Sequence, residues 1–198
     1  LLIGNGFREI LANSLTKLDY ADDSETAVKL FNPLSSDLDT MRQNMLFSVL
    51  NAIEYNQKRR NFDLKFFEFG KTYALDGEGY KETQHLVFAM TGKNEAEQWN
   101  SKKEGVSFYH LKAAVDTLVK RLKIEGIQIQ DASSKHFAYG LSYMKGQKCL
   151  VSFGAVADAD LKKADVEGQV FFADFDWDVL MKIIRKNSIQ YKEVSKFP

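Results

Sequence analysis

Cysteine and proline are scarce in this sequence, and neither sign of charge is in excess. The single cysteine among 198 residues, Cys149, excludes an internal disulfide and any multi-thiolate metal site. Lys plus Arg and Asp plus Glu both number 27, so no overall basic charge favours binding to a nucleic acid. No apolar run approaches the roughly 18 residues that a membrane-spanning helix needs. We therefore expect a globular protein, located in the cytoplasm and not in a membrane.

Histidine is also rare, which limits the metal chemistry open to the chain. The three histidines, His85, His110 and His136, lie far apart, and none is followed by a second ligand three or four residues later. Neither a phosphate-binding G-x-x-x-x-G-K-[ST] loop nor a G-x-S-x-G nucleophile motif occurs. The sequence predicts no catalytic residue, no cofactor-binding residue and no metal ligand.

Three carboxylates, Asp174, Asp176 and Asp178, alternate near the end of the chain. Carboxylate oxygens are the ligands that Mg²⁺ prefers, so a metal site is one interpretation. The simpler interpretation is that Asp176 caps a helix and Asp178 interacts with the dipole in its first turn. We favour the helix cap.

The sequence Lys58-Arg59-Arg60 is the main cluster of positive charge. It could contact the phosphates of an RNA, but cations are also expected where a helix ends. The weaker of the two interpretations is the phosphate contact.

Apolar spacing and turn residues predict a mixture of helices and hairpins. Strands joined by hairpins imply an antiparallel sheet, and we expect helices to cover one of its faces. The predicted class is α+β, in a single domain over residues 1–198 that we expect to be part of a longer chain. Helices are predicted over 6–18, 36–60, 108–122 and 177–185, and strands over 27–31, 62–75, 84–91, 126–131, 139–143, 149–156 and 170–175.

Arg42 occupies an unusual place in the helix predicted after Pro33. With 100° per residue it falls in the middle of the apolar sector that includes Met41 and Met45, where an unpaired guanidinium is unfavourable. Glu68 is the odd charge in the apolar run 66–69. We predict that Arg42 and Glu68 form a buried ion pair between the helix and the sheet.

Several short sequence motifs, taken in order, resemble the β subunit of bacterial phenylalanyl-tRNA synthetases. They are "NPLSSDLDTMRQNMLFSVLNAIEYN", "FFEFGKTY", Trp99, "FYHLKAAVDTLV" and the terminal "YKEVSKFP". The resemblance implies a class II aminoacyl-tRNA synthetase-like fold and a scaffold domain that packs against a catalytic α subunit in an (αβ)₂ assembly. It also implies that tRNA, ATP and Mg²⁺ are used by the holoenzyme. The structural and interface candidates are Asn32, Pro33, Arg42, Glu68 and Gly70.

Two departures from the class II pattern suggest that this domain is not itself catalytic. The class binds ATP through an arginine after a strand, and the matching position here is Ala74. A second ATP arginine opens the last helix, where this chain has Phe175-Asp176-Trp177-Asp178. We expect no ATP binding by this chain. Two alternatives stay open: a regulatory domain that binds an amino acid or nucleotide, and a tRNA-contacting module built on Lys58, Arg59 and Arg60.

Overall fold

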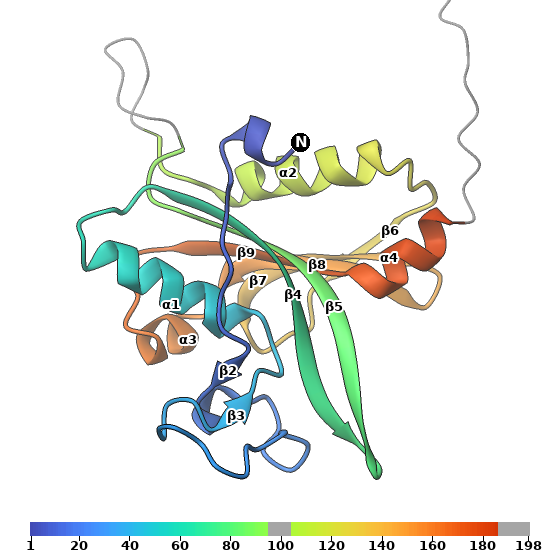
Figure 1. Cartoon of the computed structure of the whole chain (residues 1–198). Helices are drawn as coiled ribbons and strands as arrows, with labels where there is room; N and C mark the ends of the chain where they lie inside the picture. The colour runs from blue at the N-terminus through green and yellow to red at the C-terminus, as the bar shows by residue number, and fades with distance from the viewer. Residues whose placement is uncertain (95–103, 186–198) are drawn as a thin grey trace, which may run out of the picture.

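A twisted seven-stranded sheet organises the molecule (Figure 1). The computed structural model describes residues 1–94 and 104–185, so Trp99 and the terminal "YKEVSKFP" lie outside the described residues. The strand order is β1-β4-β5-β9-β8-β7-β6, antiparallel throughout except for the pair β1 and β4. The strands are β1 (Arg8–Glu9), β4 (Leu64–Asp76), β5 (Gly79–Thr91), β6 (Gln128–Asp131), β7 (Phe137–Lys145), β8 (Lys148–Val156) and β9 (Val170–Asp176).

Helices pack on both faces of this sheet, so the prediction that they cover one face is wrong. The helices α2 (Phe108–Arg121) and α4 (Trp177–Ile184) lie on one face, and α1 (Leu46–Gln57) and α3 (Asp158–Lys163) on the other. The central strand β9 explains the difference because it is apolar on both sides. Phe171 and Ala173 belong to the core under α2, whereas Val170 and Phe172 belong to the core under α1.

The first segment of the chain is extended, not helical as the spacing over 6–18 predicts. Its β1 runs parallel to β4, and the amide of Ile10 donates to the carbonyl of Phe67 at 2.9 Å. Phe7 is buried in the core while Leu11 is 92% exposed, so the apolar residues do not share one face. Pairing with a strand far along the chain outweighs the local helical periodicity.

The segment from Ser36 to Met45 is also non-helical, because its polar groups bond to distant residues. The carboxylate of Asp39 accepts from the amide of Leu18 at 3.0 Å. Thr40–Met41 forms β3, which pairs with β2 (Leu15–Thr16) in a small second sheet. Of the helix predicted over 36–60, only the part that forms α1 is helical, and it begins at Leu46. The strand predicted over 27–31 is reduced to one bridge, between Lys29 and Thr40.

Residues 11–41, which we call the N-terminal lobe, hang below the main sheet in Figure 1. Besides β2 and β3 the lobe contains a short 3₁₀ helix, Leu18–Tyr20, and another, Ile3–Asn5, precedes it in the chain. The hairpin of β4 and β5 projects alongside the lobe. Its strands pair as far as Asp76 and Gly79, so β5 begins five residues before the start of the strand predicted over 84–91.

Most of the remaining elements match their predictions, but no helix is predicted over 158–163, where α3 lies. Helix α2, the edge strand β6, the hairpin β7–β8 and strand β9 lie where predicted. Helix α4 begins with Asp176 as its N-cap, whose carboxylate accepts from the amide of Val179 at 2.9 Å. No helix in the described ranges is long and apolar enough to cross a membrane.

Gly70 on β4 allows a test of how tightly the sheet packs against Met45 and Arg42. A Cβ at this position would lie 2.3 Å from the Met45 Cε and 2.4 Å from the Arg42 Nη2. We expect Gly70→Ala to lower the free energy of unfolding by about 1–3 kcal/mol, because both side chains must shift. Urea denaturation measures this change.

Gly79→Ala is the matched control on the same hairpin. Its added Cβ would meet the Asp76 carbonyl oxygen only at an ordinary 3.7 Å. We expect this variant to be neutral or slightly stabilising. Equal losses of stability in the two variants would contradict the packing argument.

Candidate functional site

A buried ion pair lies on the face of the sheet that α1 covers. The Nη1 of Arg42 lies 3.0 Å from the Oε1 of Glu68, and the two side chains are 4% and 0% exposed. The predicted pairing is confirmed, although Arg42 precedes α1 and does not lie in it. Arg42 also donates to the carbonyl of Lys71 at 2.9 Å and to the hydroxyl of Ser48 at 3.2 Å.

Glu68 is incompletely compensated in this pair. Its Oε1 accepts from Arg42 and from the amide of Ala12 at 3.3 Å, but Oε2 has no hydrogen-bond partner among the described residues. Burial raises the pKa of Glu68, and the charge and hydrogen bond of Arg42 oppose that rise only in part. Removal of Arg42 would leave a buried carboxylate without its counter-charge.

A cavity of about 270 Å³ opens on the same face, over β5, β8 and β9. His85 and Asp174 lie on its floor, where the His85 Nδ1 is 2.7 Å from the Asp174 Oδ1. The His85 Nε2 is 2.9 Å from the hydroxyl of Thr72. Burial opposes the charged imidazole, but the hydrogen bond and charge of Asp174 outweigh it and raise the pKa of His85.

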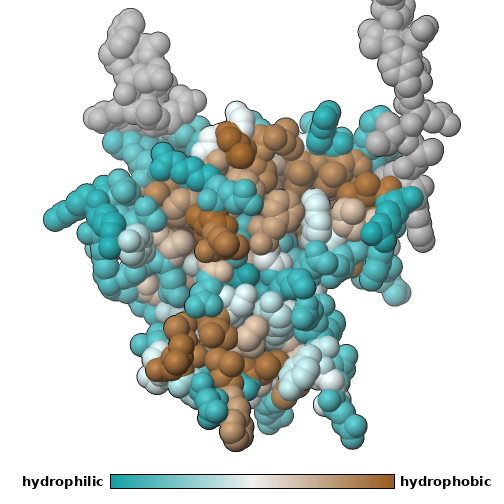
Figure 2. Space-filling model, viewed as in Figure 1, coloured by the Kyte–Doolittle hydropathy of each residue, from teal (hydrophilic) through white to brown (hydrophobic). Residues whose placement is uncertain are grey.

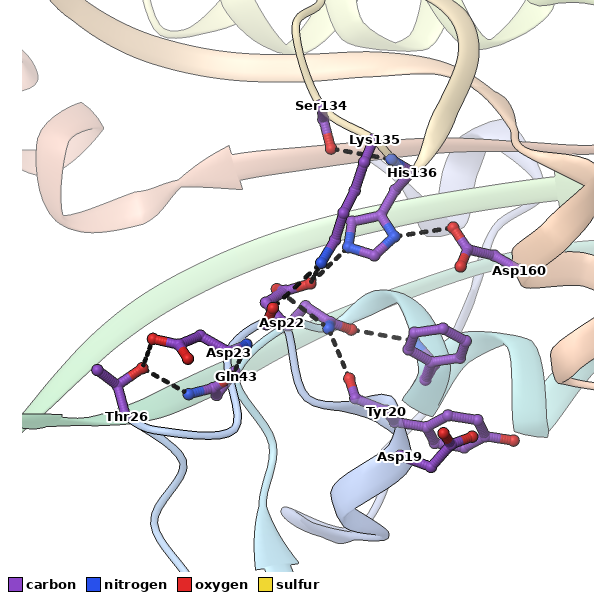
Figure 3. A network of polar contacts seen from close by, with 12 residues as sticks. Asp19, Tyr20, Asp22, Asp23, Thr26, Gln43, Ser134, Lys135, His136 and Asp160 are labelled. Atoms are coloured by element: carbon purple, nitrogen blue, oxygen red, sulfur yellow. Dashed lines mark hydrogen bonds and ion pairs between the residues drawn. The ribbon is translucent and has the colours of Figure 1, made fainter.

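His136 forms a second polar centre at the edge of this cavity, shown in Figure 3. Its Nε2 lies 2.7 Å from the Asp22 Oδ1 in the N-terminal lobe, and its Nδ1 lies 2.8 Å from the Asp160 Oδ2 on α3. The hydrogen bond to Asp22 outweighs burial and, with Asp160, raises the pKa of His136. Burial alone would raise the pKa of Asp22, but the hydrogen bond and charge of His136 outweigh it and help to lower this pKa to about 2.

Asp176, the last residue of β9, and Asp178, in the first turn of α4, both accept hydrogen bonds from backbone amides. Asp176 caps α4, and Asp178 accepts from the amide of Gln84 at 2.9 Å. Within the part of the chain that the structure describes, no group of three or more His, Cys, Asp or Glu side chains could hold a metal ion.

The positions that would hold ATP arginines offer no positive charge. Ala74 lies near the projecting end of the hairpin, paired in register with Lys81.

Of the cluster at 58–60, Lys58 forms ion pairs with Glu54 and Asp165, and the Arg59 guanidinium stacks 3.4 Å from the Tyr55 ring centre. These two cations are already engaged within the fold.

A family model described as the phenylalanyl tRNA synthetase beta chain CLM domain matches residues 1–177. The chain belongs to the phenylalanyl-tRNA synthetase beta chain family. It is 44% identical over its whole length to the phenylalanine–tRNA ligase beta subunit of Bacteroides thetaiotaomicron, and 31% identical to that of Porphyromonas gingivalis. In both comparisons it spans 26% of the relative, so it corresponds to about a quarter of those proteins.

The fold is that of a class II aminoacyl-tRNA synthetase, as the family resemblance implies. Two structures of the pyrrolysyl-tRNA synthetase of Desulfitobacterium hafniense superpose with TM-scores of 0.68 and 0.70. Each superposition covers 93% of this chain and 65% of the other, at 14% and 13% sequence identity. At such low identity the likeness concerns the fold alone.

The remaining interface candidates of the beta chain lie in two different places. Asn32 and Pro33 are exposed in an irregular part of the N-terminal lobe, whereas Gly70 adjoins Arg42 and Met45. The sequence does not predict the contacts of His136. Asp22 lies 114 residues from it, and no periodic pattern links the two positions.

Arg42→Ala tests the buried pair. We expect it to lower the free energy of unfolding by about 3–5 kcal/mol, because Glu68 would stay buried without its counter-charge. The double variant Arg42→Met with Glu68→Leu should recover most of this loss, since it removes both charges. Chemical denaturation of the three proteins measures both effects.

Lys71→Ala serves as the control for a generic charge effect. Lys71 and Glu82 are 2.7 Å apart, but their side chains are 48% and 52% exposed. Breaking this pair should change stability by less than about 1 kcal/mol. An Arg42→Ala effect no larger than the Lys71→Ala effect would show that the buried pair is not a structural tie.

The His136 contacts predict a pH-dependent stability. A histidine pKa raised on folding above its ordinary 6.5 contributes stability at lower pH, which is lost as pH rises through the raised value. The stability gap between the wild type and His136→Gln should therefore be larger near pH 6 than near pH 9. Denaturant titrations across this range measure the gap, and a constant gap would contradict the assignment. His85 is present in both proteins and cancels.

Proposed function

We propose that this chain is a non-catalytic interface domain in the β subunit of a cytoplasmic phenylalanine–tRNA ligase. In this proposal the partner α subunit attaches phenylalanine to tRNA in an (αβ)₂ assembly, with ATP and Mg²⁺ bound by the holoenzyme. The domain supplies a rigid surface for that assembly. The observation that carries the proposal is the charge of the sheet face, which is wrong for a nucleotide.

A triphosphate requires cations that neutralise its charge and orient the reacting phosphate. In this chain Asp174 and Asp176 line the cavity on the sheet, and no lysine or arginine is among its described lining residues. Arg42, a guanidinium whose charge acts on His85, is committed to Glu68. The site would repel ATP, which supports a structural role over catalysis.

The N-terminal lobe carries the apolar surface that a partner subunit could cover. Leu11, Phe31 and Leu34 are 92%, 97% and 96% exposed. Asn32 and Pro33 lie between the last two and are exposed as well. Figure 2 shows apolar surface gathered over this lobe, at the bottom of the view. Large apolar side chains exposed together are typical of an interaction surface.

A tRNA-contacting role for the cluster at 58–60 has less support. Lys58 and Arg59 are held by neighbours, and the formal net charge of the chain is zero. Phosphate binding depends on cations that are free to replace counterions.

The double variant Phe31→Ser with Leu34→Ser, made in the full β subunit, tests the interface. We expect its affinity for the α subunit to fall about tenfold or more, because each side chain is worth about 1.5–3 kcal/mol when fully buried. Sedimentation analysis of the mixed subunits measures the affinity.

Tyr109→Ser on α2 is the matched control, since Tyr109 is 77% exposed but lies outside the lobe. It should assemble like the wild type. Unchanged assembly of the lobe variant would contradict the proposed interface. Phenylalanine-dependent pyrophosphate exchange by the chain alone, above a buffer control, would contradict its non-catalytic role.

A further inference from the structure

The cavity over β5, β8 and β9 has the make-up of a small-molecule site that the interface role does not use. Its volume of about 270 Å³ is close to the lower end of the usual range for ligand pockets. Its walls come from separate elements: Leu46 at the start of α1, Phe137 at the start of β7, and Phe172 on β9. These side chains give the cavity a mainly apolar body.

The polar groups of this cavity carry an excess of negative charge. His85 is bonded to Asp174, and His136 is bonded to both Asp22 and Asp160. With Asp176, which also lines the cavity, four carboxylates therefore face two histidines and Lys135, which forms an ion pair with Asp22 at 3.3 Å. Even with both imidazoles protonated, the site remains negative.

Two carboxylate oxygens remain available to a ligand. The Oδ1 of Asp174 is taken by His85, and the Oδ1 of Asp176 is taken by the amide of Val179. The second oxygen of each carboxylate makes no hydrogen bond with any described residue. A cationic donor is the group that two such acceptors would bind, because charge-assisted hydrogen bonds are the stronger kind.

We propose that this cavity binds a small organic cation, a primary ammonium group attached to a compact apolar body. The ammonium would donate to Asp174 and Asp176, and the body would rest against Leu46 and Phe172. The inference is independent of the interface proposal, because the cavity lies on the sheet and the exposed apolar side chains lie in the N-terminal lobe.

The same lining disfavours other ligand classes. An amino acid would bring its own carboxylate, for which no described lining residue offers an uncommitted cation. A phosphate ester faces the same difficulty. A bare metal ion would lack ligands, since no cluster of three donors exists among the residues described.

Cys149, the one cysteine of the chain, lines this cavity and gives a local readout. The rate of its alkylation by iodoacetamide, followed by peptide mass spectrometry, can be measured in the assembled ligase without interference from other binding sites. Benzylamine is the probe, with benzyl alcohol, benzoate and phenylalanine as comparison compounds. At a concentration about ten times the dissociation constant, benzylamine should slow alkylation about tenfold, because only empty cavities react.

Two variants separate the site from a general charge effect. Asp176→Asn keeps a side chain that can cap α4 but removes the charge, so protection should require about tenfold more benzylamine or be lost. Asp178→Asn, two residues away and outside the cavity lining, should be protected like the wild type.

Protection by benzylamine that weakens in Asp176→Asn alone would support the proposal. Unchanged alkylation at all accessible benzylamine concentrations would overturn it. Equal protection by benzyl alcohol, or protection by phenylalanine or benzoate but not benzylamine, would also overturn it, because the ammonium would then not be the recognised group.

Discussion

The ion pair of Arg42 and Glu68 is the contact on which the arrangement of the N-terminal half depends. Through its side chain Arg42 contacts β4 and α1, at the Lys71 carbonyl and the Ser48 hydroxyl. Through its backbone it donates to Ser14 and accepts from Tyr73. One residue therefore joins the N-terminal lobe, the projecting hairpin and the first long helix. The lobe contributes little to the two main cores, so these contacts, together with those of Asp22 and Tyr20, hold it in place.

A buried pair of this kind also constrains what its neighbours can be. Gly70 leaves room for Met45 and the guanidinium, and any larger side chain would occupy the same space. Farther along the face, His85 and Asp174 form another pair beside the cavity. The charged groups on this face thus mainly satisfy one another. Catalysis of nucleotide chemistry needs charges held ready for a substrate, and here most are already compensated.

Sequence reasoning succeeds for this fold where structure is local. Helix α2 has a regular apolar stripe, and α4 follows a cap, Asp176, that its own sequence provides. It fails over 6–18 and 36–45, where the backbone bonds to residues far along the chain. The partner of Arg42 could be predicted because Glu68 stands alone among apolar residues, although the helix that placed Arg42 on an apolar side does not form there. His136 and Asp22 lie in polar surroundings where any charge is unremarkable, so nothing in the sequence marks them as partners.

The likeness to pyrrolysyl-tRNA synthetase at 13% and 14% identity follows from the same physics. The central strands are specified by apolar side chains on both faces, and many combinations of such residues fill a core of this shape. The side chains of His85, Asp174 and Asp176 belong to neither of the two cores. These polar residues can change while the sheet persists. Acidic groups can therefore stand on this face without loss of the fold, and the open oxygens of Asp174 and Asp176 are the acceptors of the proposed cationic ligand.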